Sequence, residues 1–248
     1  MSHSIDIREE AGVRYLHFGT DWVQGAMRLA KPNHLVLAYT QEMLSFLLFR
    51  EIPQRVLMIG LGAGSLVRFF RHRIPDAHCT VIEINPSVIA MAHQFFRLPP
   101  DDERLQVEVG DGCDYVAQSA ASFDAILVDG YDHHARAGRL QSLDFYRACR
   151  ARLAPQGVMV SNVFGRVRGH GQTKRDLREA FPDRVLLLPS AEASNVVATA
   201  FAEPPVRVGI AELRRQATEL RARYALPFHK WVHRLQESNP PATQAIFR

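Results

Sequence analysis

The chain has 248 residues, enough for one large domain or two small ones with a sizeable buried core. Its 47% hydrophobic and 23% charged residues, with a formal net charge of +4, are typical of a globular protein and exclude a disordered one. Three widely spaced cysteines, an acidic N-terminus and the absence of a long apolar run argue against a disulfide framework, a signal peptide and a membrane span, so we expect a cytoplasmic protein.

The first fifty residues predict a small β lobe followed by a helix. Residues 4–18 are typical of a hairpin that turns at Ala11-Gly12, and residues 21–27 form another extended segment. Apolar residues then recur at helical spacing over 33–50, with Asn33 as the expected N-cap and Pro53 beyond the end.

From Arg55 the pattern becomes an alternation of strands and helices. The strands are expected at 56–60, 79–84, 105–109, 123–129 and 158–164. The helices between and after them are expected at 65–73, 86–96, 113–120, 141–154 and 171–181. Because parallel neighbours need a crossover helix, this alternation predicts an α/β fold with a doubly wound, mostly parallel sheet.

The last part of the chain predicts two more strands and a basic helical tail. Residues 185–189 and 194–201 are expected to complete the sheet, and 209–224 form an amphipathic helix. We therefore divide the chain into a β lobe with its connecting helix (1–50), a Rossmann-like domain (51–205) and a helical tail (206–248). From residue 204 on, the chain has eight Arg or Lys against three Glu, so the body has no positive excess. A solvated amphipathic helix explains this tail better than nucleic-acid binding does.

Three acidic or glycine-rich features follow successive strands. Gly60, Gly62 and Gly64 lie between the first strand and its helix, where glycine lets the backbone approach a ligand. Glu83 ends the next strand, as a ribose-binding carboxylate does, and Asp111 follows the third, where it can accept a hydrogen bond from adenine. Each feature alone also fits an ordinary turn or a solvated acid. Together they favour an adenosyl ligand over a dinucleotide, because the third glycine of the dinucleotide fingerprint is missing.

An acidic pair follows the fourth strand. Asp129 ends that strand and Asp132 comes three residues later, at the sheet edge where ligands bind in open α/β folds. Two carboxylates there suit a cationic amine, which they can orient and deprotonate. The histidines at 133–134, and the helical pair His229 and His233, are more simply surface residues, so we expect no metal site.

The chain resembles the spermidine synthases, or polyamine aminopropyltransferases. The likeness is clearest in VLMIGLGAGSLVRFF, TVIEINPSVIAMA, VEVGDG, FDAILVDGYD and DFYRACRARLAPQGVMV. It implies a class I methyltransferase-like sheet with a small N-terminal β lobe. It also implies transfer of an aminopropyl group from decarboxylated S-adenosylmethionine to an amine such as putrescine, without a metal, and suggests a homodimer.

The resemblance also assigns roles to individual residues. By that likeness Glu83 holds the ribose, and Asp111 with Gly112 holds the adenine. Asp129 is the catalytic acid–base residue, and Asp132 lies near the amine substrate.

The glycine loop and its partners depart from the family pattern. Gln24 matches the family's glutamine, but Ala63 stands where the family has an acid that contacts the aminopropyl ammonium. Loss of that acid favours methyl transfer from intact S-adenosylmethionine, because it removes repulsion toward the methionine carboxylate. The Asp129–Asp132 pair favours aminopropyl transfer. A non-catalytic protein that binds an adenosyl compound or a polyamine is the third alternative.

Overall fold

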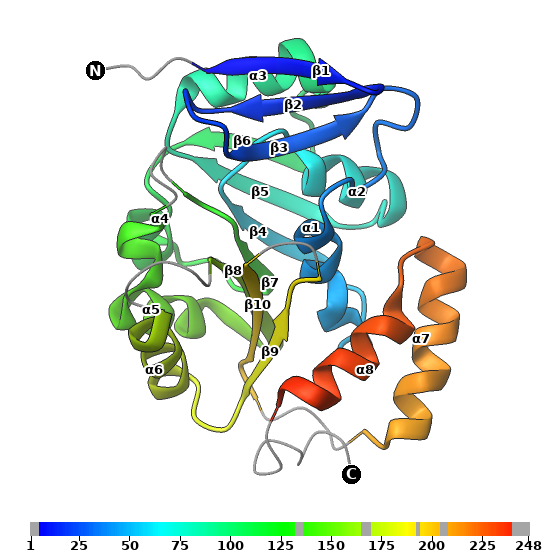
Figure 1. Ribbon diagram of the computed structural model, residues 1–248. Helices are drawn as coiled ribbons and strands as arrows, with labels where there is room; N and C mark the ends of the chain where they lie inside the picture. The colour runs from blue at the N-terminus through cyan, green and yellow to red at the C-terminus, as the bar shows by residue number, and fades with distance from the viewer. Residues whose placement is uncertain (1–4, 132–135, 165–169, 192–193, 204–207, 240–248) are drawn as a thin grey trace.

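The computed structural model describes residues 5–131, 136–164, 170–191, 194–203 and 208–239, and Figure 1 shows a small sheet above a larger one. The small sheet is antiparallel, in the order β1-β2-β3. Its strands are β1 (Asp6–Glu10), β2 (Val13–His17) and β3 (Val23–Arg28). The turn between β1 and β2 has positive φ at Ala11 (48°) and Gly12 (74°), which suits a two-residue hairpin. The predicted N-terminal β lobe is confirmed.

The large sheet has seven strands in the order β6-β5-β4-β7-β8-β10-β9. Its strands are β4 (Arg55–Ile59), β5 (His78–Glu83), β6 (Leu105–Val109), β7 (Phe123–Val128), β8 (Leu153–Phe164), β9 (Val185–Pro189) and β10 (Asn195–Phe201). Strands β4 to β8 are parallel, whereas β10 runs antiparallel to both β8 and β9. The predicted doubly wound, mostly parallel sheet is therefore confirmed.

Helices cover both faces of this sheet. They are α2 (Ser65–Arg73), α3 (Pro86–Phe96), α4 (Gly112–Gln118), α5 (Leu143–Arg152), α6 (His170–Ala180) and the 3₁₀ segment η2 (Gly138–Gln141). Because side chains alternate along a strand, Val56 and Met58 of β4 belong to the core cluster that contains residues of α2. Leu57 belongs to the cluster on the other face, which contains residues of α4, α5 and α6.

The single helix predicted over 33–50 is wrong. The chain stays extended at Leu37 and then forms α1 (Ala38–Glu42), followed by the 3₁₀ helix η1 (Met43–Leu48). The Gln41 side chain donates to the Leu35 carbonyl at 2.8 Å, which replaces a helical hydrogen bond. Every residue of η1 is buried, so tertiary packing rather than an amphipathic face determines the local conformation.

Two C-terminal helices, α7 (Ile210–Tyr224) and α8 (Phe228–Ser238), pack against the larger core cluster. The predicted apolar face of α7 is confirmed, with Leu213, Ala217 and Tyr224 buried. Helix α8 buries Trp231 in the same cluster. Among the helices of the described residues, none is long and apolar enough to cross a membrane.

Candidate active site

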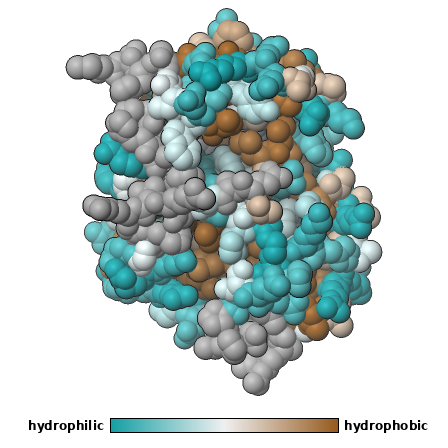
Figure 2. Space-filling model, viewed as in Figure 1, coloured by the Kyte–Doolittle hydropathy of each residue, from teal (hydrophilic) through white to brown (hydrophobic). Residues whose placement is uncertain are grey.

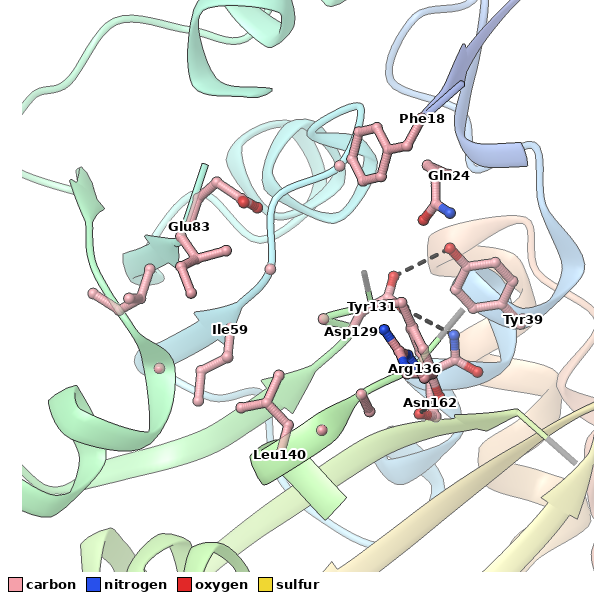
Figure 3. A pocket seen from close by; sticks show the side chains of 18 of the residues that line it. Phe18, Gln24, Tyr39, Ile59, Glu83, Asp129, Tyr131, Arg136, Leu140 and Asn162 are labelled. Atoms are coloured by element: carbon pink, nitrogen blue, oxygen red, sulfur yellow. Dashed lines mark hydrogen bonds between the residues drawn. The ribbon is translucent and has the colours of Figure 1, made fainter. Parts of the chain in front are cut away.

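A cavity of about 580 Å³ lies at the carboxyl ends of β4, β5, β6 and β7, under the small sheet. Figure 3 shows Glu83 and Asp129 in separate parts of it, with Phe18 and Gln24 coming from the N-terminal lobe. Figure 2 shows hydrophobic residues gathered beneath the N-terminal strands. The cavity also contains the exposed apolar residues Trp22 and Ile84. A partly apolar pocket with a few polar groups is typical of a small-molecule site.

The glycine loop follows β4 and forms one wall of the cavity. A Cβ on Gly60, where φ is +91°, would lie 2.2 Å from the Asp129 carbonyl oxygen. Only glycine fits there, because both the left-handed backbone and the close approach exclude a side chain. Gly62 also lines the cavity, whereas Gly64 adopts φ 66° and forms the N-cap of α2.

Ala63 lies in this loop but does not line the cavity. Its side chain is 2% exposed and packs against β3, where a Cβ on Gly25 would lie 2.5 Å from the Ala63 Cβ. The N-terminal lobe therefore covers the position at which the family pattern has an acid. Because Ala63 carries no charge, this loop exerts no repulsion on a methionine carboxylate, and the packing of Ala63 leaves that electrostatic argument unchanged.

Glu83 is the last residue of β5. It lines the cavity and accepts a hydrogen bond from the glycine loop. Its carboxylate accepts the Leu61 N–H and the Asn85 N–H, each at 2.9 Å. Burial raises the pKa of Glu83, although these backbone hydrogen bonds lower it. Each carboxylate oxygen has two acceptor positions, so Glu83 keeps acceptor capacity toward a ligand hydroxyl.

Asp111 lies at the end of the cavity formed by β6 and α4. Its Oδ1 caps α4 by accepting the Cys113 N–H at 2.7 Å, and its Oδ2 lies 3.2 Å from Arg139 Nη1. Gly112 follows, and a Cβ there would lie 2.3 Å from Ile59 Cγ2, so glycine allows α4 to pack on β4. The Arg139 side chain is 65% exposed, so its ion pair with Asp111 is solvent-screened and weak.

Asp129 follows β7 and is held by two side chains from distant parts of the sequence. The Tyr39 hydroxyl donates to Oδ2 at 3.1 Å, and Asn162 Nδ2 donates to Oδ1 at 2.8 Å (Figure 3). Asn195 Nδ2 in turn donates to Asn162 Oδ1 at 2.8 Å. Burial raises the pKa of Asp129, although both hydrogen bonds lower it. Burial and the nearby Asp129 raise the pKa of Tyr39 well above its ordinary value, so Tyr39 stays a hydrogen-bond donor. The result is an oriented, partly buried carboxyl group that lines the cavity.

Most residues singled out in the sequence come together in this cavity. They are Gln24, Gly60, Gly62, Glu83, Asp111, Gly112 and Asp129. Gly64 lies behind the loop, and Asp132 lies outside the described residues.

Sequence analysis missed several residues that also line the cavity. They are Tyr39, Asn162 and Asn195 around Asp129, and the arginines Arg136 and Arg139. Asn162 had a detectable signal, since it follows the apolar run at 158–160 in a strand that ends at the ligand-binding edge. Tyr39 had none, because it lies 90 residues before its partner Asp129.

The comparisons with known proteins agree with this architecture. The family model for the spermine/spermidine synthase domain matches residues 37–171. A polyamine aminopropyltransferase from Chromobacterium violaceum is 39% identical over 235 residues, covering 95% of this chain and 90% of that protein.

Two solved structures share the fold. A probable spermidine synthase from Corynebacterium glutamicum has a TM-score of 0.72 at 19% identity, over 98% of this chain and 92% of that one. Human methyltransferase-like protein 13 has a TM-score of 0.66 at 22% identity, over 80% of this chain and 93% of that one. The chain therefore belongs to the spermine/spermidine synthase family.

Proposed function

We propose that the protein transfers an aminopropyl group from decarboxylated S-adenosylmethionine to a small amine such as putrescine. The observation that carries this proposal is the partly buried Asp129 carboxyl, fixed between Tyr39 and Asn162 beside the glycine loop. The similarity to the polyamine aminopropyltransferase of Chromobacterium violaceum, 39% identical over 235 residues, supports the reaction class.

The donor binds at the end formed by β4, β5 and β6. Glu83 accepts hydrogen bonds from the ribose hydroxyls, using the acceptor positions that the loop leaves free. Asp111 and Gly112 hold the adenine edge, and Ile84 offers an exposed apolar side chain to the ring. Gln24 comes from the N-terminal lobe and lines the cavity, and we assign it to the reactive part of the donor.

Asp129 acts on the acceptor amine at the other end. An alkylamine is protonated at neutral pH, and it becomes nucleophilic only after it loses a proton. Asp129 accepts that proton, and burial makes this carboxylate a stronger base than an exposed one. The nitrogen lone pair then forms a bond to the propyl carbon next to the sulfonium. The carbon–sulfur bond breaks toward sulfur, and neutral methylthioadenosine leaves. The acid–base contribution of such a group is about 10²–10⁴-fold in rate.

We assign Asp132, three residues after Asp129 in the sequence, to hold the cation of the amine. We also propose that the site holds no metal, that the enzyme is cytoplasmic and that it forms a homodimer. Sedimentation velocity of the full chain measures its oligomeric state, and a monomer at micromolar concentration would contradict the homodimer.

Product analysis by mass spectrometry tests the proposed reaction. The full-length protein is incubated with putrescine and either decarboxylated or intact S-adenosylmethionine. We expect an aminopropylated amine and methylthioadenosine from the decarboxylated donor. A methylated product together with S-adenosylhomocysteine would establish methyl transfer instead. Binding of the donor without any product would favour the non-catalytic alternative.

A further inference from the structure

A buried ion pair joins helix α1 to the C-terminal helix α8. Glu42 is 2% exposed, and its Oε1 lies 2.8 Å from Arg234 Nη1. The same oxygen accepts the Ala191 N–H at 3.3 Å. Within the described residues, the second oxygen of Glu42 has no hydrogen-bond partner. Arg234 is therefore the group that compensates this buried charge, and removing it would leave the carboxylate unpaired.

Helix α1 connects Glu42 to one oxygen of Asp129. Tyr39 lies three residues before Glu42 on this helix, and its hydroxyl donates to Asp129 Oδ2 at 3.1 Å. The helix has only five residues, so it is too short to be stable alone and depends on its tertiary contacts. A shift of α1 would therefore move the Tyr39 hydroxyl away from Asp129.

The backbone that follows β9 connects Glu42 to the other oxygen of Asp129, because Ala191 donates to Glu42. Ser190 precedes Ala191, and its N–H donates to the Asn195 carbonyl at 2.7 Å. The Asn195 side chain donates to Asn162, which donates to Asp129 Oδ1, each at 2.8 Å. The two side chains that hold Asp129 are thus each connected to Glu42. Tyr39 lies on the same helix, and Asn162 is connected through Asn195 to the backbone that Glu42 contacts.

Helix α8, which carries Arg234, is held in place by the core and by the sheet. Phe228 and Trp231 are buried in the larger core cluster. At its C-terminal end, the Asn239 side chain accepts the Leu187 N–H at 2.9 Å and donates to the Leu187 carbonyl at 3.0 Å. Arg234 therefore extends from a helix that is anchored at several points to the sheet, as a supporting residue for a precise site must be.

We infer that the Glu42–Arg234 pair positions the catalytic carboxyl, acting through Tyr39 and through the Asn195–Asn162 hydrogen bonds. The inference rests on the proposed function, since it takes Asp129 to be the acid–base group. It gives the C-terminal helix a role in the chemistry, although α8 contributes no residue to the cavity among those described. Glu42 and Arg234 are positioning residues, because neither lines the cavity.

A double-mutant cycle tests this inference. We expect Arg234→Met to lower kcat about 10-fold while the Kd of methylthioadenosine changes less than twofold, because the donor end lies on other strands. In a Tyr39→Phe background the same substitution should lower kcat by a smaller factor, since part of its effect acts through the Tyr39 hydroxyl. An equal loss in both backgrounds, or a loss confined to Kd, would overturn the inference.

Further variants separate positioning from folding. Arg234→Lys keeps the charge and should retain most of the activity. Glu42→Gln combined with Arg234→Met removes both charges and so avoids an unpaired buried carboxylate, but it should still lower kcat. Full activity of this folded double variant would contradict the inference. Glu237→Gln is the matched control, because it removes an exposed contact with His233 on the same helix and should leave kcat unchanged.

Hydrogen exchange gives a readout that does not depend on turnover. In Arg234→Met, amides of residues 38–42, 189–191 and 194–196 should exchange faster, whereas those of β4 and β5 should not change. If the wild-type protein proves inactive, the proposed function fails, yet this pattern still tests whether the pair holds both elements. Unchanged exchange in both segments would refute the positioning role.

Discussion

The two ends of the cavity are built in different ways. At the donor end, backbone N–H groups hold the carboxylates of Glu83 and Asp111. Asn85 and Cys113 each donate from two residues away, and Leu61 of the glycine loop donates to Glu83. At the acceptor end, Asp129 is held by side chains that lie 90 and 33 residues away in the sequence. The donor end is thus a property of strand ends and their loops, whereas the acceptor end exists only when several distant elements pack together.

The two ends should therefore tolerate amino-acid substitutions elsewhere in the chain to different extents. A carboxylate fixed by its own loop keeps its geometry as long as the strand and the turn form. A carboxyl fixed by Tyr39 and Asn162 depends on α1, on β8 and on the elements behind them. We therefore expect distant substitutions to impair catalysis more readily than donor binding.

The largest expected effect comes from Asp129→Asn. It should lower kcat at least about 10²-fold, the scale of one general acid–base group, because the amide cannot accept the amine proton. The Kd of methylthioadenosine should change little. Steady-state kinetics together with calorimetry measure both quantities, and Asp144→Asn, an exposed acid on α5, is the control. An unchanged kcat would refute the assigned role of Asp129.

Glu83→Gln should reverse this pattern. The Kd of methylthioadenosine should rise about 10- to 100-fold, since the charged hydrogen bonds to the ribose are worth about 1.5–3 kcal/mol. The rate at saturating donor should fall much less. Glu108→Gln, on the exposed side of β6, is the matched control. If Glu83→Gln changed kcat alone, the division between a donor end and an acceptor end would be wrong.

Tyr39→Phe should change the pH dependence of kcat. The Tyr39 hydrogen bond lowers the pKa of Asp129, so removing it raises that pKa further. Because the reaction needs the ionised carboxylate, the acidic limb of the pH–kcat profile should move to higher pH, with about a fivefold loss of rate at neutral pH. A shift to lower pH, or no shift, would contradict the assigned hydrogen bond.

The smallest expected effect is on stability. Burial raises the pKa of Asp129 in the folded state, so its ionised form destabilises the fold at neutral pH. Asp129→Asn should therefore raise the free energy of unfolding by roughly 1 kcal/mol, the size of a single stabilising substitution. This gain should shrink as the pH falls through the native pKa toward the unfolded one, where both states bind the proton. Urea denaturation at several pH values measures it, and a gain that grows in acid would have the wrong sign.

The sequence predicts the parts of the molecule that depend on local features. Strand and helix periodicity predicts the seven-stranded sheet, and glycines or acids at strand ends predict Gly60, Glu83 and Asp111. These features are local, so a single sequence contains them. The helix predicted over 33–50 failed because the burial of η1 on all sides overrides helical periodicity.

The sequence predicts only part of the acceptor end of the cavity. Asp129 was predicted from its strand end, but its partner Tyr39 and the Glu42–Arg234 pair were not. Glu42 and Arg234 are 192 residues apart, and nothing in their local sequence distinguishes them from a surface Glu and Arg. Only the packing of α8 against the sheet brings them together.

The most direct test of the central claim is a calorimetric titration of the full-length protein with three adenosyl compounds. The cavity is proposed to hold an adenosyl group at Glu83 and Asp111, with a cationic aminopropyl chain directed toward Asp129. Decarboxylated S-adenosylmethionine and methylthioadenosine should therefore bind more tightly than intact S-adenosylmethionine. Preference for the carboxylated compound would contradict aminopropyl transfer, and absence of binding by all three would contradict the adenosyl site itself.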